Sequence, residues 1–229
     1  MDLKHWSMTN VLEFMEKQPI LKELQTRIQH MLDPDPAHDL AHCLRVALWT
    51  VRLNPQGDPV HSIAAALLHD IVNLPKNHPD RKLASTKSAA LAREILESYD
   101  LPPHILNEIC QAIQDHSYSH GQTPTSDLGK ALQDADRLDA LGIIGAFRNI
   151  SCGAKMNAAF YHASDPWSAE SKRVLDDHAY SMDHYPLKLL KLKDTMNTEC
   201  GKREANVRTN RMLLMLQGLG DEVGVAYPL

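Results

Sequence analysis

The chain has 229 residues, of which 43% are hydrophobic and 23% are charged, and its formal net charge is −5 at pH 7. This length and composition are typical of one globular domain with a full core, or of one domain with a helical appendage. The net negative charge argues against a protein that binds nucleic acid over its whole surface. No apolar run approaches the about 18 residues that a membrane helix needs, and the N-terminal segment has no signal-peptide core. We therefore expect a cytoplasmic protein that binds neither a nucleic-acid polymer nor a membrane.

Apolar residues recur three and four positions apart along most of the chain, a spacing that predicts amphipathic helices. In chain order, the predicted helical segments are residues 11–32, 40–53, 63–71, 83–96, 105–113, 128–144 and 205–219. Prolines and glycines lie between most of them, and no run alternates in the manner of a strand. These patterns predict an all-α protein.

The composition changes near residue 150, where a looser polar stretch begins, and a basic run follows over residues 188–211. We interpret this change as a boundary between structural parts. The predicted organisation is an N-terminal helix over residues 1–34, a metal-binding helical domain over 35–150, and a C-terminal helical subdomain over 151–229.

Residues 64–70 read AAALLHD, so a strongly apolar helix runs directly into His69 and Asp70. We expect this helix end to be buried, and a buried carboxylate is stable only if a cation or strong donors offset its charge. A divalent metal ion would do so, because imidazole and carboxylate are its usual ligands. The alternative is that His69 caps the helix and Asp70 bonds the next turn. The dipeptide alone does not decide, since 13 histidines and 19 aspartates give about one His-Asp pair by chance, and His38-Asp39 is another.

Two further segments favour the metal interpretation. Upstream, residues 38–46 (HDLAHCLRV) open an amphipathic helix in which His42 shares a face with core residues. Downstream, residues 133–142 (QDADRLDALG) contain two candidate ligands, Asp134 and Asp136. Three separated helices thus each bring a ligand type to a buried end, which is how helical proteins surround an ion.

The order H…HD…D, with H-x-x-R-V before it and D-A-D-R-L after it, resembles the HD phosphohydrolase superfamily. Four further stretches are similar to its small bacterial branch, which contains nucleotide pyrophosphohydrolases: HDIVNLPKNHP, S-x-x-S-A-x-x-A, A-I-x-x-H-S-Y-S and T-M-N-T-E-x-G-K. The resemblance covers roughly residues 35–212. It implies an HD-domain helical bundle with a C-terminal helical subdomain packed on it.

By that resemblance the metal ligands are His42, His69, Asp70 and Asp136. Asp136 is preferred over Asp134 because related members keep the aspartate directly before the Arg-Leu pair. The implied cofactor is one divalent ion, with Mn favoured over Mg, Zn, Fe and Co.

Two-metal relatives place extra histidines between the HD pair and the final aspartate, where this chain has His78, His104, His116 and His120. None of the four lies in a decisive pattern. We favour His116 as a proton donor or phosphate contact, with a surface histidine at a helix end as the alternative.

The predicted catalytic residues are Asp70, His116 and Lys76. Phosphoryl chemistry needs positive charge near the reacting group. The basic residues that we expect to contact substrate are Arg45, Lys76, Arg137, Lys188 and Lys191. For each lysine of the C-terminal run, the alternative is a solvated basic face.

The resemblance implies hydrolysis of ribo- or deoxyribonucleoside triphosphates to monophosphate and pyrophosphate. The alternatives are a nucleotidase or phosphatase for another small phosphate ester, a di-iron oxygenase, which would need six ligands, and a non-catalytic nucleotide-binding module. The expected partner is a small phosphorylated molecule. A homodimer is a further option, because Met212–Leu219 is an apolar stripe, although such a stripe more often belongs to a core.

Overall fold

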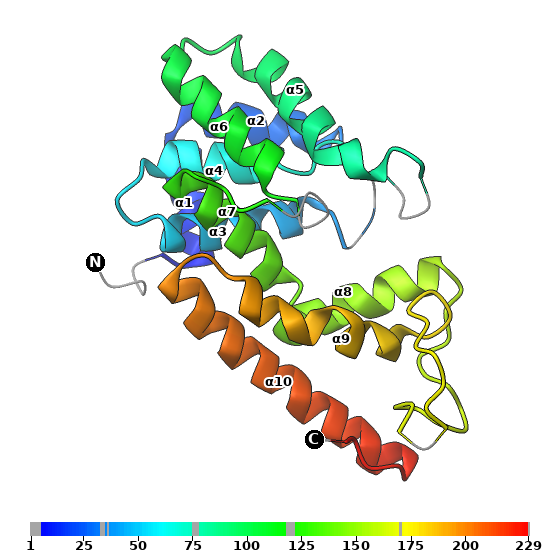
Figure 1. Ribbon diagram of the computed structural model, residues 1–229. Coiled ribbons are helices and arrows are strands. Elements are labelled where there is room, and N and C mark those ends of the chain that lie inside the picture. Colours follow the sequence, from blue (N-terminus) through cyan, green and yellow to red (C-terminus); the bar gives the residue numbers. More distant parts are fainter. Residues whose placement is uncertain are drawn as a thin grey trace. The chain divides into compact units, whose positions relative to one another are not determined.

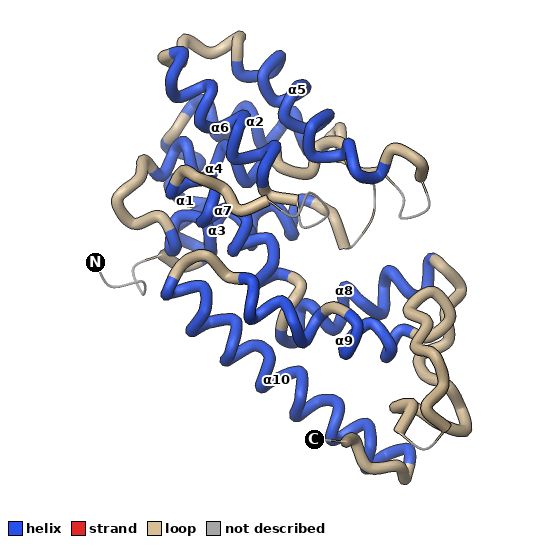
Figure 2. Tube along the Cα trace, viewed as in Figure 1, coloured by secondary structure: helices blue, strands red, loops and turns tan. Residues whose placement is uncertain are grey.

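The computed structural model describes residues 6–32, 35, 37–74, 78–117, 122–169 and 171–228. The regular structure of these residues is α-helical and includes no strand, apart from one isolated bridge between Ala159 and Tyr180 (Figure 2). The predicted all-α class is confirmed. None of the described helices is both long and apolar enough to cross a membrane.

The chain forms two compact units, Met1–Asp136 and Arg137–Leu229. The division falls within helix α7 (Asp127–Asp139), directly after one of the predicted metal ligands. The boundary that the composition suggested near residue 150 lies in the second unit, inside helix α8 (Gly142–Lys155). Each unit is described separately below.

The predicted helix over residues 11–32 is in fact two helices, α1 (Met8–Lys17) and α2 (Pro19–Gln29). The single-helix prediction was wrong because the apolar spacing continues across a break in the backbone. Pro19 has no N–H group, so it fits the first position of a helix and not its interior. Both helices bury an apolar face in the first unit.

The centre of the first unit is formed by α3 (Leu40–Leu53) and α4 (Pro59–Leu68), which pack side by side (Figure 1). Every residue of α4 from Ser62 to Leu68 is buried, which explains why its sequence is apolar all round. Helices α5 (Ala84–Leu96) and α6 (Pro103–Asp115) pack against each other, and α6 also contacts α4. A short 3-10 helix, η2 (Arg81–Leu83), leads into α5. The ends of α3, α4, α6 and α7 carry the candidate site.

The second unit is built on α8 and the long helix α10 (Glu199–Val223), which pack against each other. Short helical segments precede α10: η4 (Ser181–Asp183), α9 (His184–Leu187) and η5 (Leu189–Thr195).

The predicted helix over residues 128–144 was wrong at its end, because α7 stops at Asp139 and α8 begins at Gly142. Gly142 has a φ of +72°, which a side chain would strain. The stripe Met212–Leu219 is divided, with Met212 and Leu216 buried and Leu214 exposed.

Candidate metal centre

His42 lies in the first turn of α3, and the residue that begins this helix positions it. Asp39 is the N-cap, and its carboxylate accepts a hydrogen bond of 2.9 Å from the backbone N–H of His42. Because the next residues of α3 enter the core, the His42 side chain is completely buried. The aspartate of the first His-Asp dipeptide therefore has a capping role.

His69 directly follows α4 and is also completely buried. Its Nδ1 lies 2.7 Å from the carbonyl oxygen of Ala66, which accepts a hydrogen bond from it. A neutral imidazole that donates through Nδ1 keeps its lone pair on Nε2. Burial lowers the pKa of His69 below its ordinary value, although the charge of Asp70 acts in the opposite direction. His69 thus caps its helix through one nitrogen and offers a ligand lone pair through the other.

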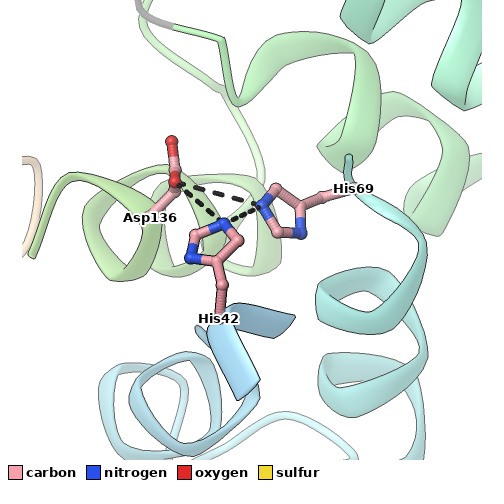
Figure 3. A group of neighbouring side chains, drawn as sticks. All are labelled: His42, His69 and Asp136. Carbon is pink, nitrogen blue, oxygen red and sulfur yellow. Dashed lines mark hydrogen bonds and ion pairs between the residues drawn. The ribbon is translucent and has the colours of Figure 1, made fainter. Parts of the chain in front are cut away.

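The four predicted ligands converge on one point in the first unit, and Figure 3 shows His42, His69 and Asp136 pointing toward one another. The two histidine Nε2 atoms are 3.2 Å apart. His42 Nε2 lies 3.9 Å from Asp70 Oδ2 and 3.7 Å from Asp136 Oδ1. His69 Nε2 lies 3.7 Å from Asp70 Oδ2 and 3.9 Å from Asp136 Oδ1.

These separations fit a divalent ion. Ligand atoms about 2.0–2.2 Å from an ion lie about 2.8–3.6 Å from one another at tetrahedral or octahedral angles. The measured separations, 3.2–3.9 Å, are within a few tenths of an ångström of that range. Two buried imidazoles whose Nε2 atoms face each other beside two carboxylates are also a donor set that a cation would satisfy.

The two carboxylates form the accessible part of the site. The side chains of Asp70 and Asp136 keep 21% and 25% of their surface exposed, whereas His42 and His69 keep none. Burial acts to raise the pKa of both carboxyl groups, but the neighbouring histidines outweigh this effect. The pKa of Asp136 is lowered, and the pKa of Asp70 lies well below its usual range. Both groups are therefore ionised at neutral pH, as ligands must be.

His116, which the sequence analysis favours as a proton donor or phosphate contact, lies near the site at the end of α6. Its Nε2 lies 3.5 Å from Asp70 Oδ1, and its ring centroid lies 5.0 Å from that of His69. Burial opposes protonation of His116, but its hydrogen bond to Asp70 and the charge of that group raise its pKa. Among the residues described between the HD pair and the last ligand, His78 accepts a local hydrogen bond from Asp80 N, and His104 is exposed.

Two overlapping groups of potential ligands are present in the described part of the chain: His42, His69 and Asp136, and His69, Asp70 and His116. Both groups contain His69, whose Nε2 has one lone pair and can bind one ion at a time. The two groups therefore cannot both hold an ion through all of their members.

Helix α7 is tied to the end of α6 by Gln133. Its side-chain amide donates hydrogen bonds of 2.9 Å to the carbonyl of Asp115 and 3.0 Å to that of Gln122. Asp115 directly precedes His116, and Gln133 lies one turn before Asp136. This link sets the distance between the residues that α6 and α7 bring to the site.

Asp134, the rival for the last ligand position, is completely buried, and neither group of potential ligands among the described residues includes it. This is consistent with the choice of Asp136.

The predicted substrate contacts belong to both units. Arg45 is half-buried on α3 in the first unit, and Lys76 lies outside the described residues. Arg137, Lys188 and Lys191 belong to the second unit. There Arg137 is buried and donates to the carbonyl of Thr195, Lys188 is half-buried and Lys191 is exposed.

His38 also lies near the centre, although in the sequence the His38-Asp39 dipeptide is no more than chance would produce. His38 lines a cavity of about 230 Å³ together with Asp70. Its ring centroid lies 6.0 Å from that of His42. The spacing His38-x-x-x-His42 was the available signal, but such a spacing alone is common.

Residues 39–141 match the HD domain family. Over 211 residues the chain is 28% identical to the uncharacterized protein YpgQ of Bacillus subtilis (strain 168), a match that covers 88% of this chain and 93% of YpgQ.

Solved structures are similar over nearly the whole chain. The crystal structure of Bacillus subtilis YpgQ in complex with ADP has a TM-score of 0.66 and 25% identity, and the match covers 88% of this chain and 96% of that one. The crystal structure of an HD-superfamily hydrolase from Bacillus thuringiensis has a TM-score of 0.67 and 29% identity, with 93% and 98% covered. These matches support a hydrolase, and all four predicted ligands lie inside the matched segment. The chain therefore contains a segment, residues 39–141, that matches the HD domain family.

Proposed function

We propose that the chain is a divalent-metal-dependent phosphohydrolase that splits nucleoside triphosphates into monophosphate and pyrophosphate. The observation that carries this proposal is the convergence of His42, His69, Asp70 and Asp136 on one point, at separations that suit one ion. The metal-ligand roles of these residues are part of the proposal.

A divalent ion held by these residues would polarise a phosphoryl oxygen and lower the pKa of a nearby water molecule. The chain itself supplies the rest of the chemistry. The two fully buried histidines would hold the ion on its inner side, and the two partly exposed carboxylates leave the outer side accessible to the substrate. The charges of Asp70 and Asp136 also help to keep water oriented for attack on phosphorus.

His116 contributes a proton-bearing group next to Asp70. Its Nδ1 lies 2.6 Å from the carbonyl of Ile113, so the ring is fixed and Nε2 faces the carboxylate at 3.5 Å. Because the raised pKa favours the imidazolium, His116 can donate to Asp70 and hold that carboxylate in place, or donate to a phosphoryl oxygen.

A nucleotide is the favoured substrate because a relative of similar fold, YpgQ, binds ADP in its crystal structure. Arg45 is on α3, one turn after His42, and is one of the predicted cationic contacts. Lys76, Arg137, Lys188 and Lys191 stay predictions for binding the phosphate chain. Manganese is the proposed ion, on the resemblance alone.

The test is a product screen of the purified protein. Nucleoside tri-, di- and monophosphates would be incubated with Mn²⁺, Mg²⁺, Co²⁺ or Zn²⁺, and phosphate and pyrophosphate would be measured separately. We expect pyrophosphate from triphosphates, and its loss on chelation and in Asp136→Ala. Phosphate from monophosphates would instead identify a nucleotidase. Product release that Asp136→Ala leaves unchanged would exclude the proposed centre.

A further inference from the structure

We infer that His38 is a further catalytic residue, whose Nε2 accepts a hydrogen bond from the water molecule that attacks phosphorus, and that Asp35 positions it. This inference rests on the proposed phosphohydrolase function. The structure supplies three independent observations for it: a shared cavity, a fixed ring and a place beside the ligands.

The first observation is the cavity of about 230 Å³ in the first unit. Its polar lining comes from His38, Asp70 and Asn73, and its apolar lining includes Met31, Leu32 and Val72. A water molecule occupies about 30 Å³ in the liquid, so this cavity has room for water and for part of a substrate. His38 is thus on the wall of the space that Asp70, a proposed metal ligand, opens into.

The second observation is the hydrogen bond that fixes the His38 ring. His38 Nδ1 lies 3.0 Å from Asp35 Oδ2, and Asp35 Oδ1 accepts a bond of 2.9 Å from the backbone N–H of Ala37. The side chains of His38 and Asp35 are mostly buried, at 18% and 11% exposure. Because an ionised carboxylate only accepts hydrogen bonds, Nδ1 is the donor and neutral His38 keeps its lone pair on Nε2.

The third observation is the position of that ring. It lies edge-on to the ring of His42, with centroids 6.0 Å apart. No partner for His38 Nε2 occurs among the residues that the structure describes, although the ring borders a cavity shared with an ionised carboxylate. An acceptor nitrogen held at this place can orient a water O–H and aim its oxygen lone pair at a phosphorus atom beside Asp70.

The first unit contains another histidine next to an aspartate, and this pair lies outside the cavity. His61 Nε2 lies 3.9 Å from Asp58 Oδ2, and the Asp58 side chain is 51% exposed. Neither of these residues lines the cavity, and Asp58 is the N-cap of α4. His61→Ala is therefore a matched control, because it removes an imidazole near an aspartate at a distance from the centre.

The experiment compares the wild type with His38→Ala, His38→Gln, Asp35→Asn and His61→Ala. For each protein, Mn²⁺ affinity, thermal midpoint, kcat and KM for a nucleoside triphosphate would be measured. We expect His38→Ala to lower kcat by about 100-fold with little change in KM or Mn²⁺ affinity. His38→Gln should restore part of the loss, because its side-chain oxygen can accept the same hydrogen bond, and His61→Ala should behave as wild type.

The Asp35→Asn variant tests whether Asp35 sets the proton position on the His38 ring or only packs against it. The amide keeps an oxygen for Ala37 N–H but turns an N–H toward His38, which would move the imidazole proton to Nε2 and remove the acceptor. Nitrogen-15 NMR of the histidine side chains in the metal-free protein reads this directly. We expect the Nδ1–H form of His38 in the wild type, the Nε2–H form in Asp35→Asn, and a similar loss of kcat in Asp35→Asn and His38→Ala.

The outcomes separate the two proposals. Wild-type kcat in His38→Ala, with Asp136→Ala inactive, would overturn the role of His38 and leave the proposed function standing. A loss of Mn²⁺ affinity parallel to the loss of kcat would also overturn it, because His38 would then act through the ligands. A wild-type protein that releases neither phosphate nor pyrophosphate would overturn both proposals.

Discussion

His69 and His116 are held in the same way, and their rings meet edge to face with centroids 5.0 Å apart. Each residue directly follows a helix, α4 or α6, and each Nδ1 bonds the carbonyl three residues earlier, at 2.7 Å for His69 and 2.6 Å for His116. Both Nε2 atoms consequently face Asp70. The same local hydrogen bond thus orients a proposed metal ligand, His69, and a proposed proton donor, His116, toward the carboxylate of Asp70.

This arrangement predicts separate effects for the two histidines. His116→Gln removes the charged partner of Asp70 but none of the four proposed ligands. We expect activity to fall about 10- to 100-fold with a smaller change in Mn²⁺ affinity. His69→Gln should instead abolish metal binding. Calorimetric titration of both variants with Mn²⁺, beside initial rates, tests the distinction, and equal Mn²⁺ affinities in the two variants would contradict it.

The His116–Asp70 pair also predicts how the stability of the metal-free protein depends on pH. The pKa of His116 is raised in the folded state above its ordinary value of 6.5, so its contribution is fully present below about pH 6.5 and is lost as pH rises through the folded pKa. Asp70, whose pKa is lowered, stays ionised throughout this window. Urea unfolding with a chelator should therefore show a larger destabilisation by His116→Gln at pH 5.5 than at pH 8.5. An equal difference at both pH values would count against the pair.

The choice of Asp136 over Asp134 gives a second comparison. Asp136→Asn should lower Mn²⁺ affinity by at least about 100-fold, because it removes a charged oxygen from the proposed set. Asp134→Asn, two residues earlier on α7, should bind Mn²⁺ as the wild type does, whatever it costs in stability. If only Asp134→Asn lost the metal, the assignment of the fourth ligand would be reversed.

Gln133 is predicted to be a stability residue of the first unit. Gln133→Ala would leave the carbonyl oxygens of Asp115 and Gln122 without this donor, and we expect a loss of about 1–3 kcal/mol in the free energy of unfolding. Gln111→Ala is the control, since Gln111 is exposed on α6 and, within the described part of the chain, its side-chain amide bonds the Asp115 side chain alone. Denaturant titration measures both, and similar losses in the two variants would argue against the role of Gln133.

Much of the helical structure could be predicted from local patterns. The segment predicted over residues 40–53 coincides with α3, and the segment over 83–96 contains α5, because apolar spacing records which face is buried. The breaks were harder to predict. The apolar spacing continues through Pro19, and the turn before α8 depends on the positive φ of Gly142, which no periodicity shows.

Three of the four proposed ligands could be predicted from helix ends, because His42 lies in the first turn of α3 and His69 and Asp70 directly follow the apolar helix α4. Asp136 lies within α7 and is proposed on the resemblance. The surroundings of Asp70 could be predicted only in part, because the sequence favours His116 among four histidines without a decisive pattern. Whether His38 and His116 reach the centre depends on how α2, α3 and α6 pack, and a count of His-Asp pairs predicts nothing about packing. Tertiary distances, not residue types, distinguish His116 from His104.

The most direct test of the account is a metal titration of the chelator-stripped protein, with bound Mn²⁺ and pyrophosphate release from a nucleoside triphosphate measured on the same samples. We predict that activity returns as bound metal rises and reaches its maximum at about one ion per chain, since His69 Nε2 can serve only one ion. Activity that is independent of metal, or that needs a second bound ion, would contradict the single centre formed by His42, His69, Asp70 and Asp136.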